Sequence, residues 1–153
     1  MHSHAVDILL VEDNPDDLEL ALHALRKENL ANRIQVARDG EEALDYIFAR
    51  GVYAGANGYN IPKLILLDLK LPKVDGIEVL RQIKTHPRTK TIPVVILTAS
   101  TEQRDVVEGY SLGVNGYIQK PVDFDQFRDT VKQIGLFWLV INEPPPATVS
   151  SVK

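Results

Sequence analysis

Five short apolar stretches, rich in Val, Ile and Leu, recur along the chain. They cover residues 6–11, 34–37, 64–67, 94–97 and 114–118. In three of them (8–11, 64–67 and 94–97) polar and apolar residues do not alternate, which is typical of strands buried on both faces of a parallel sheet. The pattern therefore predicts five strands, at least three of them covered by helices on both sides.

Between these stretches lie segments in which apolar residues recur every three or four positions. The first opens with Asn14 and Pro15, a capping side chain followed by proline at the first helical position. The second opens at Asp39 with Glu42 three residues on, as in a capping box. Further helices are predicted to begin near residues 75 and 100 and to span about residues 123–141. This alternation predicts five βα units in a doubly wound, three-layer α/β domain.

Two segments interrupt this alternation. Residues 51–63 contain three glycines and a proline, and they predict a long surface loop whose glycines lack the order of a phosphate-binding loop. Three consecutive prolines at 144–146 end the last helix. We therefore expect one domain over residues 1–141 and a proline-containing, mobile tail over residues 142–153.

Composition narrows the class of protein. A length of 153 residues suggests one domain, and 44% hydrophobic with 25% charged residues is typical of a globular chain. The net charge of −4 lacks the basic excess of a nucleic-acid binder. The absence of cysteine excludes disulfides, thiolate metal sites and cysteine nucleophiles. Because no signal peptide or membrane-length apolar stretch is found, we expect a cytoplasmic protein with no membrane or nucleic-acid partner.

Polar side chains lie at the carboxyl ends of four of the predicted strands. Glu12 and Asp13 end the first strand, Asp68 ends the third, Thr98 ends the fourth, and Lys120 follows the fifth. In an open parallel sheet these ends border one crevice. Each residue alone has an ordinary explanation; Glu12 and Asp13, for example, suit the positive end of the following helix. Their joint occurrence at one sheet edge instead favours a functional site.

Three neighbouring carboxylates repel one another and need a cation at neutral pH. Oxygen donors without cysteine or histidine favour a hard ion, Mg²⁺ (or Mn²⁺). Such an ion neutralises phosphoryl oxygens while a carboxylate attacks phosphorus, which gives an aspartyl phosphate. We therefore predict Asp68 as the phosphoacceptor, Glu12 and Asp13 as metal ligands, and Lys120 and Thr98 as phosphate-binding residues.

The same residues resemble the receiver domain of two-component response regulators, the CheY-like family. Residues 11–14 (Val-Glu-Asp-Asn) resemble the family's acidic pair, and residues 66–72 with Asp75 and Gly76 resemble its phosphoacceptor motif. Residues 95–99 are similar to the strand that carries the switch Thr/Ser, and residues 117–121 to the switch aromatic and the Lys-Pro pair.

This resemblance, over about residues 5–140, implies a flavodoxin-like sheet of strand order 2-1-3-4-5. It implies that Asp68 takes its phosphoryl group from a histidine kinase. It further implies a metal held by Glu12, Asp13, Asp68 and the backbone carbonyl of Lys70, phosphoryl oxygens bound by Thr98, Ala99 and Lys120, and a switch formed by Thr98 and Tyr117. Glu12 departs from the more usual Asp at the first acidic position.

No DNA-binding or catalytic domain is expected after residue 141, so the chain is interpreted as a single-domain response regulator that signals through its own surface. Residues 136–141 are six consecutive apolar residues, too many for one helix face. They predict a homodimer interface formed by Phe137, Trp138, Leu139 and Ile141, with burial by the tail as the alternative. A narrower resemblance to the regulators of bacterial and cyanobacterial phytochromes implies a bacteriophytochrome kinase as partner.

Three other functions fit the sequence less well. A phosphohydrolase with an aspartyl-phosphate intermediate usually needs a second acid two residues after its nucleophile, where this chain has Lys70. A flavodoxin-like or dinucleotide-binding module needs a glycine-rich loop after the first strand, whereas residues 12–17 are acidic. A degenerate receiver is disfavoured because every expected site position has a usable side chain. We therefore expect a signalling domain that promotes only its own phosphorylation and dephosphorylation, and not an enzyme.

Overall fold

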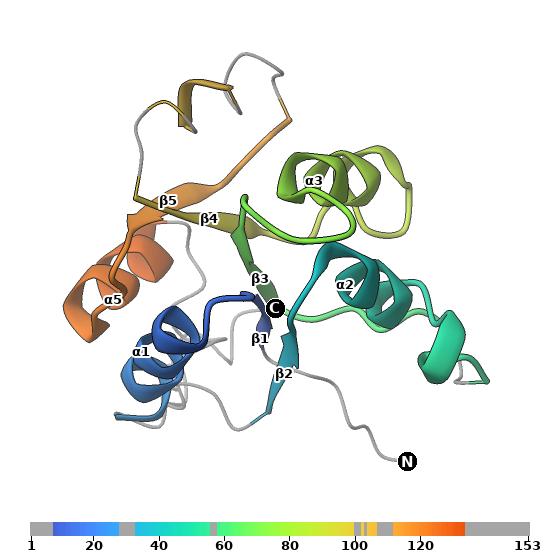
Figure 1. Cartoon of the computed structure of the whole chain (residues 1–153). Coiled ribbons are helices and arrows are strands. Elements are labelled where there is room, and N and C mark those ends of the chain that lie inside the picture. The colour runs from blue at the N-terminus through green and yellow to red at the C-terminus, as the bar shows by residue number, and fades with distance from the viewer. Residues whose placement is uncertain are drawn as a thin grey trace, which may run out of the picture.

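The computed structural model describes residues 8–27, 33–55, 58–99, 102, 104–106 and 112–133. Strands and helices alternate along the chain (Figure 1). The strands are β1 (Ile8–Val11), β2 (Ile34–Ala37), β3 (Leu64–Asp68), β4 (Val94–Thr98) and β5 (Gly116–Gln119). The helices are α1 (Pro15–Lys27), α2 (Gly40–Ile47), α3 (Gly76–Thr85) and α5 (Phe124–Gln133), with a 3-10 turn, η1, at Gly51–Tyr53.

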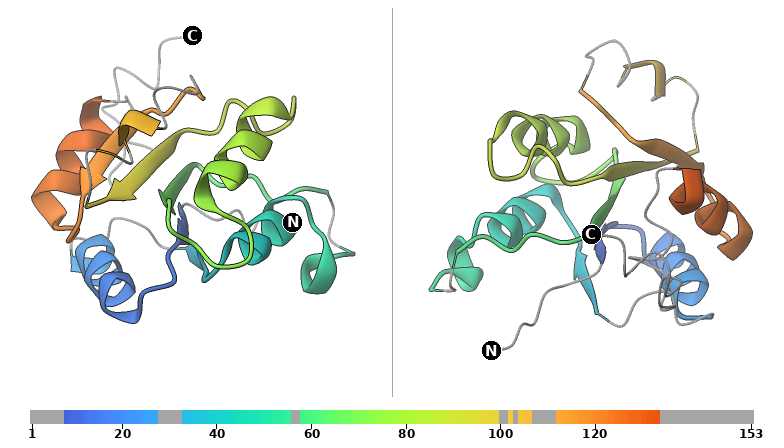
Figure 2. Two further views of the ribbon diagram at one scale, coloured as in Figure 1. Left: turned by 45° about the horizontal axis from the view of Figure 1, so that its top comes forward. Right: turned by 180° about the vertical axis from the view of Figure 1, so that it is seen from behind.

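The strands form one parallel sheet in the order β2-β1-β3-β4-β5. Helices α1 and α5 cover one face of the sheet, and α2 and α3 cover the other (Figure 2). This is the doubly wound, three-layer fold with the 2-1-3-4-5 order, as predicted. The order places β1 and β3 side by side in the middle of the sheet, so that Val11 lies opposite Leu67.

Two hydrophobic cores explain why the central strands show no polar alternation. Ile8 and Leu10 of β1 pack toward α1 and α5, while Leu9 and Val11 pack toward α2 and α3. All residues of β1, β3 and β4 are buried. A strand that contributes to two cores has no solvent-facing positions, so successive residues are apolar.

The helices begin where the capping residues predicted, with one difference. The Asn14 side chain accepts hydrogen bonds from the backbone N–H groups of Asp16 and Asp17, and Asp39 accepts one from Glu42 at 2.7 Å. The Glu42 carboxylate, however, accepts from the backbone N–H of Arg38 at 3.0 Å, instead of that of Asp39. Only half of the expected capping box therefore forms, because the residue before the cap is the better-placed donor.

The fifth strand begins two residues later than predicted. The Asn115 side chain accepts a hydrogen bond from the backbone N–H of Val94 at 2.9 Å, and the Asn115 N–H donates to the Val94 carbonyl. Since this asparagine occupies both polar groups of Val94, the backbone ladder to β4 starts only at Gly116. At the other end, β3 and β4 end at Asp68 and Thr98, as predicted.

Parts of the predicted organisation lie outside the described residues. Of the fourth predicted helix, residues 102 and 104–106 are helical. The last helix is described to Gln133, so the predicted dimer residues Phe137, Trp138, Leu139 and Ile141, and the tail 142–153, fall beyond it. Within the described part of the chain, no helix has the length and apolar character needed to cross a membrane.

Candidate functional site at the carboxyl edge of the sheet

Four strand ends bring the predicted site residues to one edge of the sheet. Glu12 directly follows β1, its N–H still donating to the Ala37 carbonyl of β2 at 3.0 Å. Asp68 and Thr98 are the last residues of β3 and β4. Lys120 follows β5, and its N–H donates to the Thr98 carbonyl at 3.0 Å. The backbone hydrogen bonds of the sheet thus continue up to the functional residues and fix the positions of their Cα atoms.

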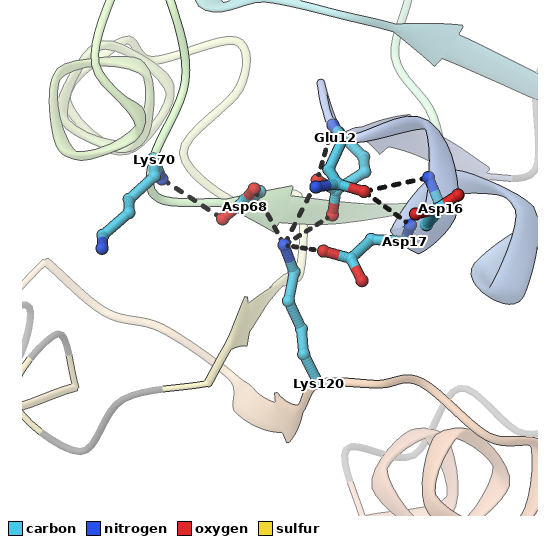
Figure 3. Close-up of polar contacts among 7 residues, drawn as sticks. Glu12, Asp16, Asp17, Asp68, Lys70 and Lys120 are labelled. Carbon is cyan, nitrogen blue, oxygen red and sulfur yellow. Dashed lines mark hydrogen bonds and ion pairs between the residues drawn. The ribbon is translucent and has the colours of Figure 1, made fainter.

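The Lys120 ammonium group connects these strand ends (Figure 3). Its Nζ donates to Asp68 Oδ2 at 3.0 Å, to Glu12 Oε2 at 3.2 Å and to Asp17 Oδ2 at 3.0 Å. A lysine has three N–H donors, so all of them are used here. Glu12 and Lys120 are 108 positions apart in the sequence, and their contact is therefore a direct product of the fold.

The Asp68 carboxylate is buried and held on both oxygens. Only 4% of the residue is exposed, and its second oxygen, Oδ1, accepts a hydrogen bond from the Lys70 N–H at 3.2 Å. The Lys70 side chain is directed away from Asp68 (Figure 3). A buried carboxylate with two donors is well compensated for the loss of water, and its orientation is defined.

Helix α3 starts directly against the backbone that carries Asp68. The Gly76 N–H donates to the Leu69 carbonyl at 3.0 Å. A Cβ on Gly76 would lie 2.5 Å from the Asp68 carbonyl oxygen and 2.5 Å from the Leu69 Cα. Only glycine therefore fits here without displacing the end of β3.

Three carboxylates form a cluster with the donors that a hard cation prefers. One oxygen each from Glu12, Asp13 and Asp68 lies within 4.8 Å of the others, and Asp13 is exposed whereas the other two are buried. Glu12 Oε1 is buried without a hydrogen-bond partner, although it lies 3.0 Å from Lys120 Nζ. The single Lys120 ammonium group compensates only part of the charge of three neighbouring carboxylates, and buried charge without compensation is costly. The residues present therefore fit a Mg²⁺ or Mn²⁺ ion.

Burial and crowding change the protonation of this cluster. Burial, followed by the neighbouring Asp68 carboxyl group, raises the pKa of Glu12 to about 7. Burial alone would lower the pKa of Lys120, but its hydrogen bonds to Glu12 and Asp68 raise that pKa above the ordinary value. At neutral pH the ammonium group is thus charged, while Glu12 lies near the midpoint of its titration.

The predicted switch residues lie on the two neighbouring strands β4 and β5. Thr98 is 3% exposed at the end of β4, and Ala99, the next residue, is exposed. Tyr117 lies half-buried on β5, opposite Ile96 of β4. The Arg104 guanidinium carbon lies 4.3 Å from the centre of the Tyr117 ring, which is a cation–π geometry.

Sequence reasoning missed the role of Asp17. From the sequence, this acid has no role beyond favouring the positive end of the first helix, but in the structure it supplies the third carboxylate on Lys120. The available signal was its position on the first turn of a helix that starts directly at the site. A side chain on that turn lies close to the end of β1, and hence to any cation placed there.

A comparison with protein families decides the assignment. A model of the response regulator receiver domain matches residues 8–132. The chain belongs to this family. Receivers are signalling domains, and phosphorylation by a kinase is their typical function.

Similar proteins narrow the relationship. The probable methanogenesis regulatory protein FilR2 of Methanothrix harundinacea is 45% identical over 90% of this chain and 86% of its own length. Response regulator Rcp1 of Synechocystis is 41% identical over 86% of this chain and 88% of its own length. The Mn²⁺-bound structure of Rcp1 superposes with a TM-score of 0.69, and the match covers 92% of this chain and 99% of the Rcp1 chain. The bacteriophytochrome response regulator AtBRR is 52% identical over 92% of this chain and 100% of its own, with a TM-score of 0.82. The receiver is thus homologous to phytochrome response regulators.

Proposed function

We propose that Asp68 accepts a phosphoryl group from a histidine kinase of the phytochrome type, and that the resulting aspartyl phosphate changes the surface of this receiver. The observation that carries the proposal is the bridge from Lys120 to both Glu12 and Asp68 at the carboxyl edge of the sheet. This bridge orients a buried carboxylate beside a cluster that suits a divalent cation.

The transfer itself needs one nucleophile and one leaving group. An Asp68 carboxylate oxygen forms a bond to phosphorus while the phosphorus–nitrogen bond to the kinase histidine breaks, and the imidazole nitrogen keeps the electron pair. Lys120 then exchanges its contact with the Asp68 carboxylate for one with a phosphoryl oxygen, a move of small amplitude for a flexible side chain. The Ala99 N–H and the Thr98 hydroxyl are the donors proposed for the remaining oxygens.

Glu12, Asp13, Asp68 and the backbone carbonyl of Lys70 are the groups that would hold Mg²⁺ or Mn²⁺. When bound, this ion supplies positive charge opposite the phosphoryl oxygens. In the absence of the ion, Lys120 holds Glu12 and Asp68 close together. The surrounding residues exclude water from Asp68, and its hydrogen bonds fix its orientation.

The change in surface begins with Thr98 and Tyr117. Phosphorylation adds about −1.5 to −2 charges, and Thr98 moves to donate to the new group. Tyr117 then turns inward and leaves its contact with Arg104. Because that contact joins β5 to the predicted fourth helix, its loss alters the face of the molecule that these segments form.

Labelling with acetyl phosphate tests the phosphoacceptor. We expect the protein to be modified in the presence of Mg²⁺, Asp68→Asn to abolish the modification, and a chelator to suppress it. The matched control is Asp16→Asn, because Asp16 is an exposed acid on the first turn of α1 and is not one of the three carboxylates that contact Lys120. Modification that survives Asp68→Asn would contradict the assignment. Repeated turnover of a phosphate monoester would instead favour a phosphohydrolase.

The type of kinase is tested by transfer from two phosphorylated kinases. AtBRR and Rcp1 support a phytochrome kinase as partner, whereas FilR2 is named as a regulator of methanogenesis. We expect faster transfer to Asp68 from a bacteriophytochrome kinase than from a histidine kinase without a photosensory region. Equal rates would remove the phytochrome assignment and leave the phosphoacceptor intact. We place this reaction in the cytoplasm, without membrane or nucleic-acid partners.

We also propose that two copies associate through Phe137, Trp138, Leu139 and Ile141. The support is the run of six apolar residues at 136–141 in a chain of net charge −4. Size-exclusion chromatography with light scattering, with and without beryllofluoride and Mg²⁺, should give twice the mass of the 17.1 kDa chain. Trp138→Ala should shift this mass toward the monomer, and a monomer under all conditions would refute the dimer.

A further inference from the structure

Hydrogen bonds and ring packing hold the loop between α2 and β3 against α2. The Asn60 N–H donates to the Ile47 carbonyl at 2.9 Å, and its side-chain amide donates to the Tyr46 carbonyl at 2.7 Å. The Tyr53 hydroxyl donates to Glu42 at 3.1 Å, and its ring packs edge-on against Tyr46 with centres 5.2 Å apart. In Figure 1 this segment is the teal ribbon that follows α2. Its contacts give Tyr59 a defined place beside the end of the helix.

A cavity of about 500 Å³ lies between this loop and the end of α3. Phe48, Arg50 and Tyr59 line it from the α2 side, and Thr85 and His86 line it from the α3 side. Helices of a βα unit run opposite to the strands, so the carboxyl ends of α2 and α3 lie at the amino edge of the sheet. The cavity is therefore at the edge opposite to Asp68. Its volume is within the range of small-molecule sites, about 300–1,000 Å³.

Three rings of the cavity wall form a triangle. Phe48 lies 5.2 Å from Tyr59 and 5.2 Å from His86, and Tyr59 lies 5.4 Å from His86, all between ring centres. All three residues are only half-buried. Rings that fix one another in tilted and edge-to-face packing need no ligand to stay in place. They offer a preformed apolar wall.

Two guanidinium groups lie on these rings. The Arg50 guanidinium carbon is 5.4 Å from the centre of the Phe48 ring, and that of Arg88 is 5.1 Å from the centre of the Tyr59 ring. A stacked guanidinium uses its flat face for the ring, and its N–H donors remain directed outward in the plane. Arg50 has only an exposed, 3.8 Å contact with Asp45, and Arg88 makes no ion pair with any residue that the structure describes. These donors are available to an anion.

His86 adds one further directed donor. Its Nδ1 accepts a hydrogen bond from the Arg88 N–H at 3.0 Å. In the neutral ring the proton is therefore on Nε2, which makes Nε2 a donor.

The charge of the surrounding sequence supports an anionic ligand. Residues 46–67 and 79–101 contain no Asp or Glu, although the whole chain has a net charge of −4. The cations in these two segments are Arg50, Lys63, Arg81, Lys84, Arg88 and Lys90. The Lys84 ammonium is bound by the carbonyls of Lys90 and Ile92, and Arg81 contacts Glu78, which leaves Arg50 and Arg88 as the cations at the cavity rings.

We propose that this cavity binds a small aromatic anion, a planar ring that carries a phosphate or carboxylate group. The ring packs against Phe48, Tyr59 and His86, and the anionic group accepts hydrogen bonds from Arg50 and Arg88. Arg50 lines the cavity itself, and Arg88 lies on the ring of Tyr59, which also lines it, so both guanidinium groups are next to the proposed ring site. This site is separate from the phosphorylation site and does not depend on its function.

Titration of ¹⁵N-labelled protein tests the proposal with four probes. AMP and 4-hydroxybenzoate have both a ring and an anionic group, while adenosine lacks the charge and inorganic phosphate lacks the ring. We expect AMP or 4-hydroxybenzoate to shift the amide signals of Tyr59 and His86 with saturation below about 1 mM, and the other two probes to leave them nearly unchanged. Phenyl phosphate and benzoate, which share one ring and differ in the anionic group, then show whether phosphate or carboxylate binds more tightly.

Substitutions separate this site from general basic charge. Arg88→Gln should weaken binding about tenfold, because it removes hydrogen bonds from a charged donor, and Tyr59→Leu should weaken it by a similar factor. The matched control is Arg128→Gln, since the Arg128 guanidinium also lies on a ring, 4.9 Å from the centre of Phe124, but on α5. Unchanged amide signals of residues remote from the cavity check that each variant is folded.

The outcomes are distinct. Loss of binding in Arg88→Gln and Tyr59→Leu, with normal binding in Arg128→Gln, supports the site. No saturable shift with either aromatic anion overturns the proposal. Equal shifts with inorganic phosphate overturn it as well, because the rings then take no part.

Discussion

The two edges of the sheet use charge in opposite ways. At the carboxyl edge three acids, Glu12, Asp17 and Asp68, engage all three donors of Lys120, and Asp13 lies in one carboxylate cluster with Glu12 and Asp68. At the amino edge cations lie on aromatic rings, with no acid in the adjoining segments 46–67 and 79–101. At the carboxyl edge each Lys120 donor already has a carboxylate partner, so a cation and a phosphoryl group are needed to rearrange these contacts. At the amino edge the N–H donors of Arg50 and Arg88 remain available to a ligand.

This difference also shows what each edge contributes to stability. Opposite charges buried at the carboxyl edge depend on one another, so the removal of one partner leaves the others uncompensated. The half-buried rings and stacked guanidinium groups at the amino edge are independent of any single charge. Substitutions at the carboxyl edge should therefore have the larger effects.

The largest effect is expected for Lys120→Met. Without its ammonium group, Glu12 and Asp68 repel each other, and a phosphoryl oxygen loses its donor. We expect the rate of labelling by acetyl phosphate to fall about 100-fold or more, as measured by phosphate-affinity electrophoresis. Lys120→Arg, which keeps the charge but not the point geometry, should be intermediate. A Lys120→Met protein that is labelled at the normal rate would show that this edge does not depend on Lys120.

The next effect is expected for Gly76→Ala, which tests the backbone under Asp68. The new methyl group would contact the Asp68 carbonyl, and we expect the free energy of unfolding to fall by about 1–3 kcal/mol, together with slower labelling. The control is Gly116→Ala, whose Cβ would meet side-chain methyl groups and no backbone atom: the Cγ2 of Thr130 at 2.9 Å and the Cγ2 of Val95 at 3.8 Å. Urea denaturation measures both. If both variants lose the same free energy of unfolding, the close contact between the start of α3 and the end of β3 has no particular importance for stability.

The pH dependence of stability tests the protonation of Glu12. Its pKa is raised from 4.5 to about 7, mainly by burial, so the folded protein holds a proton that the unfolded chain has released. The stabilisation from this group is fully present below pH 4.5 and is lost as pH rises through 7; between pH 5.5 and 8 the loss is on the order of 2 kcal/mol. Urea denaturation of the metal-free protein at pH 5.5 and 8 should show this fall, and Glu12→Gln should lack it. Parallel pH profiles for the two proteins would place the titration elsewhere.

The smallest effect is expected for Asp17→Asn. Lys120 then keeps its contacts with Glu12 and Asp68 but is released from the partly exposed third acid. Since such a pair contributes up to about 1 kcal/mol, we expect the rate of labelling to rise about two- to fivefold, in a salt-dependent way. Asp16→Asn removes the same charge one position earlier and should have less effect. A slower reaction in Asp17→Asn would make Asp17 a supporting residue.

The carboxyl edge was largely predictable from the sequence, and the amino edge was not. Buried parallel strands are read from runs such as residues 64–67, and the end of each run places Glu12, Asp68 and Thr98 at the same edge without knowledge of any contact. This reasoning does not predict which side chains contact one another. Which acids share Lys120, and that Glu42 accepts from Arg38, depend on rotamers that periodicity does not encode.

The ring cluster at the amino edge has no such sequence signal. Phe48, Tyr59 and His86 come from a helix end, a loop and the end of another helix, with no common spacing. The loop at residues 51–63 was predicted only as a surface loop, and its fastening by Asn60 and Tyr53 follows from three-dimensional packing. A long loop is therefore the segment where the fold adds most to what the residues alone indicate.

The most direct test of the account is to trap the phosphorylated residue. The protein is phosphorylated by a phytochrome kinase with Mg²⁺ and treated with borohydride, which reduces an aspartyl phosphate to homoserine, and the modified peptide is sequenced by mass spectrometry. We expect homoserine at position 68, with Asp13 and Asp17 unmodified. Homoserine at another acid, or a stable phosphate on a hydroxyl side chain, would contradict the central role of Asp68.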